Sequence, residues 1–129
     1  MFGLFKKKAT PQTDSDLEYI ISRVRYNTEP HDNIPFSEEE RIFFQALVNQ
    51  CRNSKINPRE IRLTRMSSKG FNVDTHDGYI GKINLFESRR FMQYLIGMKT
   101  IKELHDPTLE ECIAAIPYRV KHIKYCKRT

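Results

Sequence analysis

Several features that would identify a membrane or secreted protein are missing from this chain of 129 residues. No apolar run approaches the roughly 20 residues needed to cross a bilayer. The start, MFGLFKKK, places its charges after its apolar residues, unlike a secretory signal. The three cysteines are odd in number and contain no CxxC, which argues against a disulfide framework and a zinc site. We therefore expect a cytoplasmic protein without a membrane span.

Catalytic signatures are equally scarce. The five glycines form no phosphate-binding loop, and no GxSxG or cysteine–histidine motif marks a nucleophile. Histidine beside aspartate, which can supply two adjacent metal ligands, occurs at His31-Asp32, His76-Asp77 and His105-Asp106. Aspartate at these places is also expected for turn and capping reasons alone. We predict that the protein is not an enzyme and uses no cofactor or metal, with a metal-dependent hydrolase as a minor alternative.

The charge of the chain is unevenly distributed. The net charge is +6, of which residues 1–13 carry +3, residues 14–50 carry −5 and residues 51–129 carry +8. Residues 1–13 have the composition of a flexible basic tail, and residues 14–129 have the length of a single domain. Such an asymmetry bears on the partners of a protein rather than on its fold.

The centre of the chain has the pattern of an antiparallel sheet. From Arg59 to Phe86, apolar and polar residues alternate with a period of two, and Gly70 and Gly78 end two tight turns. Three strands are predicted, with one apolar face made of Ile61, Leu63, Phe71, Val73, Tyr79, Ile83 and Leu85. The polar face would carry Arg62, Thr64, Asn72, Asp74, Lys82 and Asn84. Residues 91–96 favour a fourth strand over a helix because of their aromatic and β-branched content.

Helices are predicted before and after this sheet. Ser15 with Glu18, and Ser37 with Glu40, have the spacing of capping boxes, and the first of these helices should end near residues 26–27. Asp106 before Pro107 predicts the start of a C-terminal helix, which Pro117 should kink or divide.

The fold class predicted is therefore α+β. A three- or four-stranded antiparallel β-meander would pack against two N-terminal helices and a proline-broken C-terminal helical region. The residues expected to meet in its core are Phe43, Leu47, Phe71, Val73, Ile83, Leu85 and Ile113.

Nucleic-acid binding is the function that the charges favour, because clustered lysines and arginines displace counterions from phosphates. The candidate contacts lie on the polar sheet face and in the C-terminal helix: Arg62, Lys82, Arg89, Arg90, Lys121, Lys124, Lys127 and Arg128, with Arg65 as a further candidate on the sheet. Tyrosines that could stack on bases are Tyr79, Tyr94, Tyr118 and Tyr125.

The alternative is a protein-interaction or accessory module, such as a regulator from a host, a phage or a mobile element. Its basic surface would meet an acidic protein partner, or an exposed edge strand would accept a strand from the partner. The oligomeric state is left open by the sequence.

Three segments of the chain, YIGKINL, RRFMQYL and TLEECIAAIPYRVKHIKYC, resemble parts of small uncharacterised proteins of Gram-positive bacteria and their mobile elements. Those proteins share a glycine-lysine strand and a C-terminal helix. The resemblance covers residues 60–126 and implies no assigned activity, so it transfers no functional residue.

Overall fold

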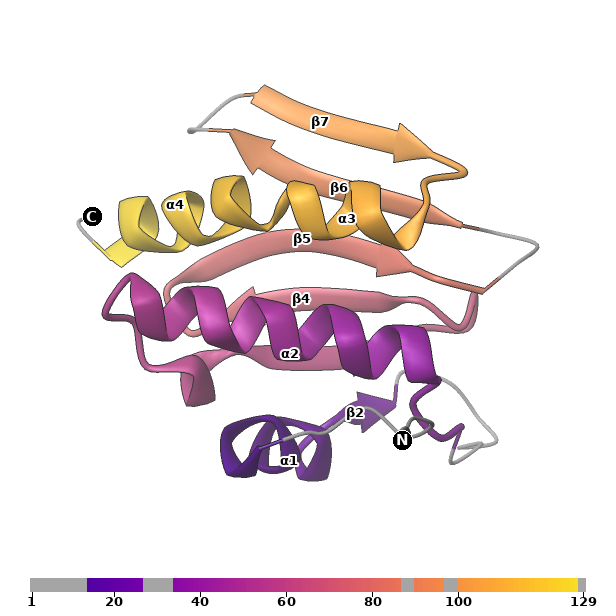
Figure 1. Cartoon of the computed structure of the whole chain (residues 1–129), viewed down its shortest axis with the longest axis horizontal. Coiled ribbons are helices and arrows are strands. Elements are labelled where there is room, and N and C mark those ends of the chain that lie inside the picture. Colours follow the sequence, from indigo (N-terminus) through magenta and orange to yellow (C-terminus); the bar gives the residue numbers. More distant parts are fainter. Residues whose placement is uncertain (1–13, 27–33, 87–89, 97–99, 128–129) are drawn as a thin grey trace, which may run out of the picture.

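A mixed sheet of six strands forms one layer of the protein, and helices cover one of its faces (Figure 1). The computed structural model describes residues 14–26, 34–86, 90–96 and 100–127, so the predicted tail of residues 1–13 lies outside it. In chain order, which is also their order in the sheet, the strands are β2 (Arg25–Tyr26), β3 (Arg62–Arg65), β4 (Phe71–Thr75), β5 (Gly78–Asn84), β6 (Phe91–Ile96) and β7 (Thr100–His105). The helices are α1 (Ser15–Ser22), α2 (Glu38–Asn53), the short 3₁₀ helix η1 (Pro58–Glu60), α3 (Leu109–Ala114) and α4 (Ile116–Lys127).

The α+β class is confirmed, but the sheet is larger than predicted. Strands β3 to β7 form a meander of consecutive antiparallel pairs, in which residues 91–96 are the fourth strand, as expected. The prediction of three or four strands was wrong because it omitted β7 and β2. Every residue of β7 is at least partly exposed, so its sequence shows no apolar face. β2 is only two residues long and pairs with β3 in parallel, where the sequence predicted the end of the first helix.

The two N-terminal helices are present with one change of cap. Asp14, rather than Ser15, caps α1, and its side chain accepts a hydrogen bond from the Leu17 amide. The capping box of α2 is confirmed: the Ser37 side chain accepts from the Glu40 amide, and the Glu40 carboxylate accepts from the Ser37 amide. The α1 helix ends at its cap several residues earlier than predicted, because the chain there extends into β2.

The C-terminal helical region begins two residues later than predicted. Thr108 caps α3, and it exchanges the two hydrogen bonds of a capping box with Glu111. Asp106 has a φ of 54°, a left-handed conformation outside the helix, so it is not the cap. The predicted division near Pro117 is confirmed, since α3 is capped by Ala115 and α4 starts at the next residue.

Substitutions at the two candidate caps are expected to have different effects. Thr108→Ala should lower the free energy of unfolding by about 1 kcal/mol, because the Glu111 amide loses its acceptor. Asp106→Gly should leave the free energy of unfolding unchanged or raise it, because glycine adopts a positive φ without strain. Urea denaturation of both variants measures the difference, and an equal loss from Asp106→Gly would contradict the observed cap.

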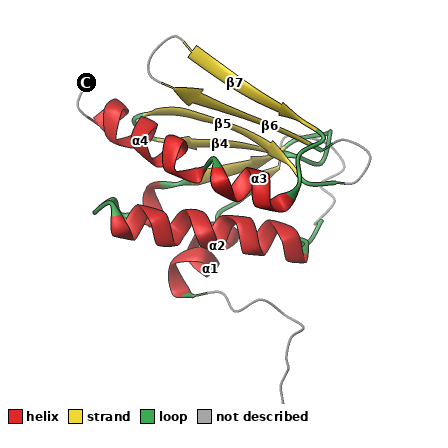
Figure 2. Cartoon of the chain, turned by 45° about the horizontal axis from the view of Figure 1, so that its top comes forward, coloured by secondary structure: helices red, strands yellow, loops and turns green. Residues whose placement is uncertain are grey.

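The hydrophobic core lies between the sheet and the helices. Figure 2 shows α2 and α4 on the same face of the sheet, and α4 packs on α2, β5 and β6. The predicted core is confirmed: Phe43, Leu47, Phe71, Val73, Ile83 and Leu85 are buried in one cluster, and Ile113 packs against it half-buried. No helix in the described part of the chain is both long and apolar enough to span a membrane.

A β-bulge in β5 changes which side chains face the core. Val73 pairs with Gly81, while the next residue along β4 pairs with Tyr79, so Ile80 is the extra residue. The prediction that Tyr79 is buried was therefore wrong. Ile80 is buried in its place, and the exposed Tyr79 donates a hydrogen bond from its hydroxyl to the Gln93 side chain.

A buried arginine lies beneath this bulge. The side chain of Arg119, from α4, is completely buried. Its Nη2 donates to the carbonyl oxygen of Lys82 at 2.7 Å and to that of Gln93 at 3.2 Å. Because burial disfavours its charged form, the pKa of Arg119 falls to about 10. The guanidinium thus ties α4 to the backbone of β5 and β6, and we expect it to stabilise the fold rather than to bind a ligand.

Candidate nucleic-acid interface

Arginine side chains join the two acidic N-terminal helices to each other and to the rest of the chain. The ion pairs are Arg41 with Glu18, Arg52 with Asp14 and Asp16, Arg59 with Asp16, Arg65 with Glu40, and Arg90 with Glu39. The hydrogen bonds from Arg59 and Arg52 lower the pKa of the Asp16 carboxyl. The acidic part of the chain is therefore largely engaged with arginines of the same chain.

Two of the predicted contact residues are held inside the structure. Arg90 donates to Glu39 Oε1 at 2.7 Å and to the carbonyl oxygens of Leu85 and Pro107, and the hydrogen bond to Glu39 raises its pKa. Arg65 does not lie on the polar face: its side chain is 2% exposed and forms a buried ion pair with Glu40. Neither residue belongs to the interface that we propose.

The open face of the sheet is less basic than the sequence suggests. Arg62 and Lys82 are exposed there, as predicted, but Arg62 donates to Asp74 at 3.1 Å. Gln93, which pairs with Lys82 across the sheet, donates to Glu103 at 3.4 Å. Cationic and anionic side chains thus alternate across β3 to β7 on this face, so the attraction of these strands for phosphates is weak.

The exposed face of α4 gathers cations and aromatic side chains. Tyr118, Lys121 and Tyr125 follow at intervals of three and four positions, and Lys124 lies three positions after Lys121, which places all four on one arc of the helix. All four are exposed. Lys102 of β7 is exposed beside them, because it pairs across the sheet with a residue of β6 on which Tyr118 stacks. We call these five residues the α4 surface.

Both tyrosines of the α4 surface are held in place by an inner aromatic ring. Tyr118 stacks on Tyr94, with 5.9 Å between ring centroids, and Tyr125 stacks on His122, with 6.2 Å. Tyr118 is 49% exposed and Tyr125 is 36% exposed. One face of each ring is therefore supported by the protein, and we expect the opposite face to be available for a further planar group.

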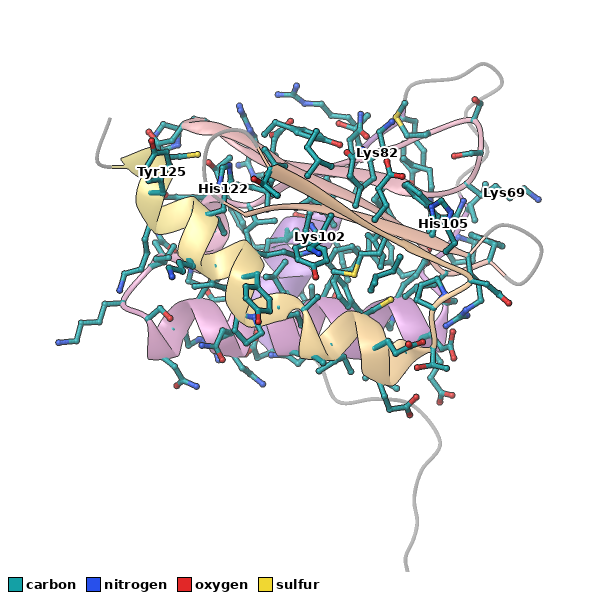
Figure 3. All side chains as sticks on the ribbon, turned by 90° about the horizontal axis from the view of Figure 1, so that it is seen from above. Lys69, Lys82, Lys102, His105, His122 and Tyr125 are labelled. Carbon is teal, nitrogen blue, oxygen red and sulfur yellow. The ribbon has the colours of Figure 1, made fainter. Side chains whose placement is uncertain are left out.

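The lysines of the α4 surface have no carboxylate partner at salt-bridge distance among the described residues. Figure 3 shows Lys102 on the helical side of the sheet and Lys82 on the opposite side. The two basic regions predicted from the sequence are thus on different faces.

Lys127 ends α4, and its side chain is not described. Arg89 and Arg128 lie outside the described residues.

A cysteine–histidine pair lies near the end of α4, with 3.4 Å between Cys126 Sγ and His122 Nε2. A nucleophilic cysteine requires a lowered thiol pKa. Here burial, together with the charge of Asp77, raises the pKa of Cys126, and burial lowers the pKa of His122. Both shifts favour the neutral forms, so they disfavour the thiolate that nucleophilic catalysis needs.

One of the His-Asp pairs lies near a third ligating side chain. Ligand atoms of Glu60, His76 and Asp77 lie within 4.8 Å of one another. Such a set suits Zn²⁺ or Mn²⁺ in type. However, Glu60 and His76 also line a pocket that contains four arginines, whose charge opposes a cation. Among the described residues no such group forms around His105, and residues 31–32 lie outside the structure's described ranges.

This pocket is the basic feature that the sequence analysis missed. Its arginines are Arg23, Arg25, Arg59 and Arg62, and we call it the arginine pocket. Only Arg62 was among the predicted contacts. Arg23 is the C-cap of α1 and Arg25 begins β2, whereas the sequence predicts that both lie in the first helix.

Comparisons of this chain with protein-family models, with curated proteins and with solved structures found no match. The resemblance of residues 60–126 to small proteins of Gram-positive bacteria therefore stays a prediction. The residues of the α4 surface and of the arginine pocket are the features of the chain from which its function can be argued.

Proposed function

We propose that this protein is a non-catalytic, cytoplasmic protein that binds single-stranded nucleic acid through the α4 surface. The observation that supports this function is the combination of three lysines, which have no carboxylate partner among the described residues, with two tyrosines that are supported on one ring face. Proteins that bind single strands combine backbone-tracking cations with aromatic rings on which bases stack.

The geometry of the α4 surface favours a single strand over a duplex. Tyr118 and Tyr125 are two helical turns apart, about 10 Å along the axis, so each ring can stack on its own base. Lys121 and Lys124 lie between them in sequence, where the phosphates that link those bases would run. Bases in a duplex are stacked and paired, so their faces are closed to tyrosine rings.

Loss of two lysines is expected to weaken binding and to reduce its salt dependence. Lys121→Gln/Lys124→Gln should make the slope of log affinity against log salt shallower by about 1.4, because each phosphate contact to a single strand contributes about 0.7. The measurement is fluorescence anisotropy of labelled single-stranded DNA and RNA oligonucleotides over a salt series.

The matched control is Lys55→Gln/Lys69→Gln, which removes the same charge from exposed positions elsewhere. This control should keep the wild-type slope. Tyr118→Leu should weaken single-strand binding at every salt concentration without changing the slope, because stacking involves no ion release. Equal slopes for the two lysine variants, or no binding at low salt, would contradict the proposal.

A second candidate function is protein interaction at the β7 edge of the sheet. β7 is the outermost strand, no described strand pairs with its outer side, and Ile101 on it is 56% exposed. Edge strands of this kind accept a strand from a partner protein. A protein captured by the wild type but not by an Ile101→Lys variant, in the absence of nucleic-acid binding, would favour this alternative.

A further inference from the structure

The arginine pocket is a cavity of about 410 Å³ at the β2 edge of the sheet, beside α1. Arg23 follows α1, Arg25 lies in β2, Arg59 lies in η1 and Arg62 lies in β3. Glu60 is the one acidic side chain among the residues that line it. The lining therefore has a net positive charge, although it is assembled from three separate stretches of the chain, residues 19–25, residues 59–62 and His76.

Two of these arginines are oriented by carboxylates that do not line the pocket. Arg59 Nε donates to Asp16 at 2.7 Å, and Arg62 Nε donates to Asp74 at 3.1 Å. In each case the carboxylate binds the Nε side of the guanidinium. The terminal Nη groups of both arginines make no hydrogen bond within the described part of the chain, so they remain available to an acceptor in the pocket.

The other two arginines have no carboxylate partner among the described residues. Arg23 is positioned by an aromatic ring, because its Cζ and that of Arg59 each lie 4.7 Å from the centre of the Tyr19 ring. Arg25 pairs with Thr64 of β3, so it lies on the same sheet face as Arg62. The guanidinium groups are thus brought together around one cavity rather than spread over a surface.

We infer that the arginine pocket binds a phosphate or pyrophosphate group. Guanidinium groups bind phosphate oxygens through paired, charge-assisted hydrogen bonds, and four of them around one cavity match a polyanion. The volume exceeds that of a phosphate group alone and accommodates a ligand of nucleotide size. The phosphate would come from a free nucleotide or from the end of a nucleic-acid strand.

This inference does not depend on the function proposed for the α4 surface, because pyrophosphate has no base to stack on a tyrosine. The two features nevertheless lie at one end of the sheet. His76 of the β4–β5 turn lines the arginine pocket, and Gly78 of the same turn approaches Cys126 of α4. The C-terminal end of α4 is therefore near this turn, whereas Arg25 and Arg62 lie on the open face of the sheet and Lys102 lies on the helical side.

The test uses the whole chain of 129 residues and inorganic pyrophosphate as the probe. Titration followed by ¹⁵N NMR should show saturable shifts at the arginine Nε–H groups and at Tyr19, with a Kd of about 1 mM or tighter. Arg23→Gln/Arg25→Gln should weaken this binding at least about tenfold, because two charge-assisted contacts are lost. If the double variant does not fold, the single variant Arg25→Gln replaces it in the binding test. Arg25 is exposed and has no ion-pair partner among the described residues, so its substitution should not affect folding.

The matched control is Arg41→Gln, which removes one arginine charge from an ion pair outside the pocket and should bind pyrophosphate as the wild type does. Unsaturated or absent shifts up to about 10 mM pyrophosphate, or equal binding by the pocket variants, would overturn the inference.

The source of the phosphate is then distinguished with a pair of oligonucleotides. Tighter binding of a 5′-phosphorylated single strand than of its 5′-hydroxyl form, lost in the pocket variant, would support a strand end. Equal binding of the two oligonucleotides, together with pyrophosphate binding, would support a free nucleotide.

Discussion

Replacing Arg65 by methionine is expected to lower the free energy of unfolding by about 3–5 kcal/mol. The side chains of Arg65 and Glu40 are each 2% exposed, and Arg65 Nη1 lies 2.7 Å from Glu40 Oε2. Methionine fills a similar volume but leaves the Glu40 carboxylate buried without its counter-charge. Breaking a buried ion pair from one side is costly for this reason, whereas an exposed pair contributes little.

The surroundings of Arg65 increase the expected loss. Its guanidinium also donates to the carbonyl oxygen of Lys69 at 2.7 Å, and its Cζ lies 4.0 Å from the centre of the Phe71 ring. The same group therefore connects α2, the β3–β4 turn and the aromatic part of the core. Methionine can satisfy none of these acceptors.

Urea denaturation measures this effect, and the matched control is Arg62→Met on the same strand. Arg62 forms an exposed ion pair with Asp74, so its loss should cost at most about 1 kcal/mol. The double variant Arg65→Met/Glu40→Met should recover part of the stability, because no unpaired charge remains in the core. If Arg65→Met were no more destabilising than Arg62→Met, the buried pair would not stabilise the fold as the structure indicates.

The second large effect is expected at Gly81. Its φ is 148°, a conformation that residues with a side chain rarely adopt, and an added Cβ would lie 2.1 Å from the carbonyl oxygen of Gln93. That oxygen belongs to the backbone of β6, so it cannot move without breaking the pairing of β5 and β6. Gly81→Ala should therefore lower the free energy of unfolding by more than about 3 kcal/mol.

Gly78→Ala is the matched control for this substitution. An added Cβ at Gly78 would first meet the Cys126 side chain, at 3.1 Å, and that side chain can shift. The expected loss is below about 1.5 kcal/mol. Thermal and urea unfolding of both variants give the comparison, and equal losses would show that the bulge at Gly81 relaxes more easily than its contacts suggest.

Short-range patterns in the sequence determined much of the fold. The alternation from Ile61 to Leu85 predicted three strands and most of their buried residues, and the Ser37–Glu40 spacing predicted the start of α2. These predictions succeeded because side-chain periodicity and helix capping depend on residues only two to four positions apart. The same reasoning placed Lys121 and Lys124 on one exposed face of the last helix.

The errors arose where a residue's environment depends on distant segments. Strict alternation places Arg65 with Leu63 on the buried face, whereas its charge favours the polar face. Arg65 is buried because Glu40 lies beside it as a counter-charge. β7 has no apolar face of its own, and it becomes a strand because its backbone pairs with β6. The bulge that buries Ile80 in place of Tyr79 likewise follows from the pairing of β4 with β5.

The sequence by itself determined which elements form and where the cations lie along the chain. Only the tertiary structure decided which of those cations are available to a ligand. Arg65 and Arg90 are engaged by carboxylates of α2, whereas Lys102, Lys121 and Lys124 have no such partner in the described part of the chain. The physical reason is that helix and strand formation are local, while ion pairing and burial depend on contacts between residues far apart in the sequence.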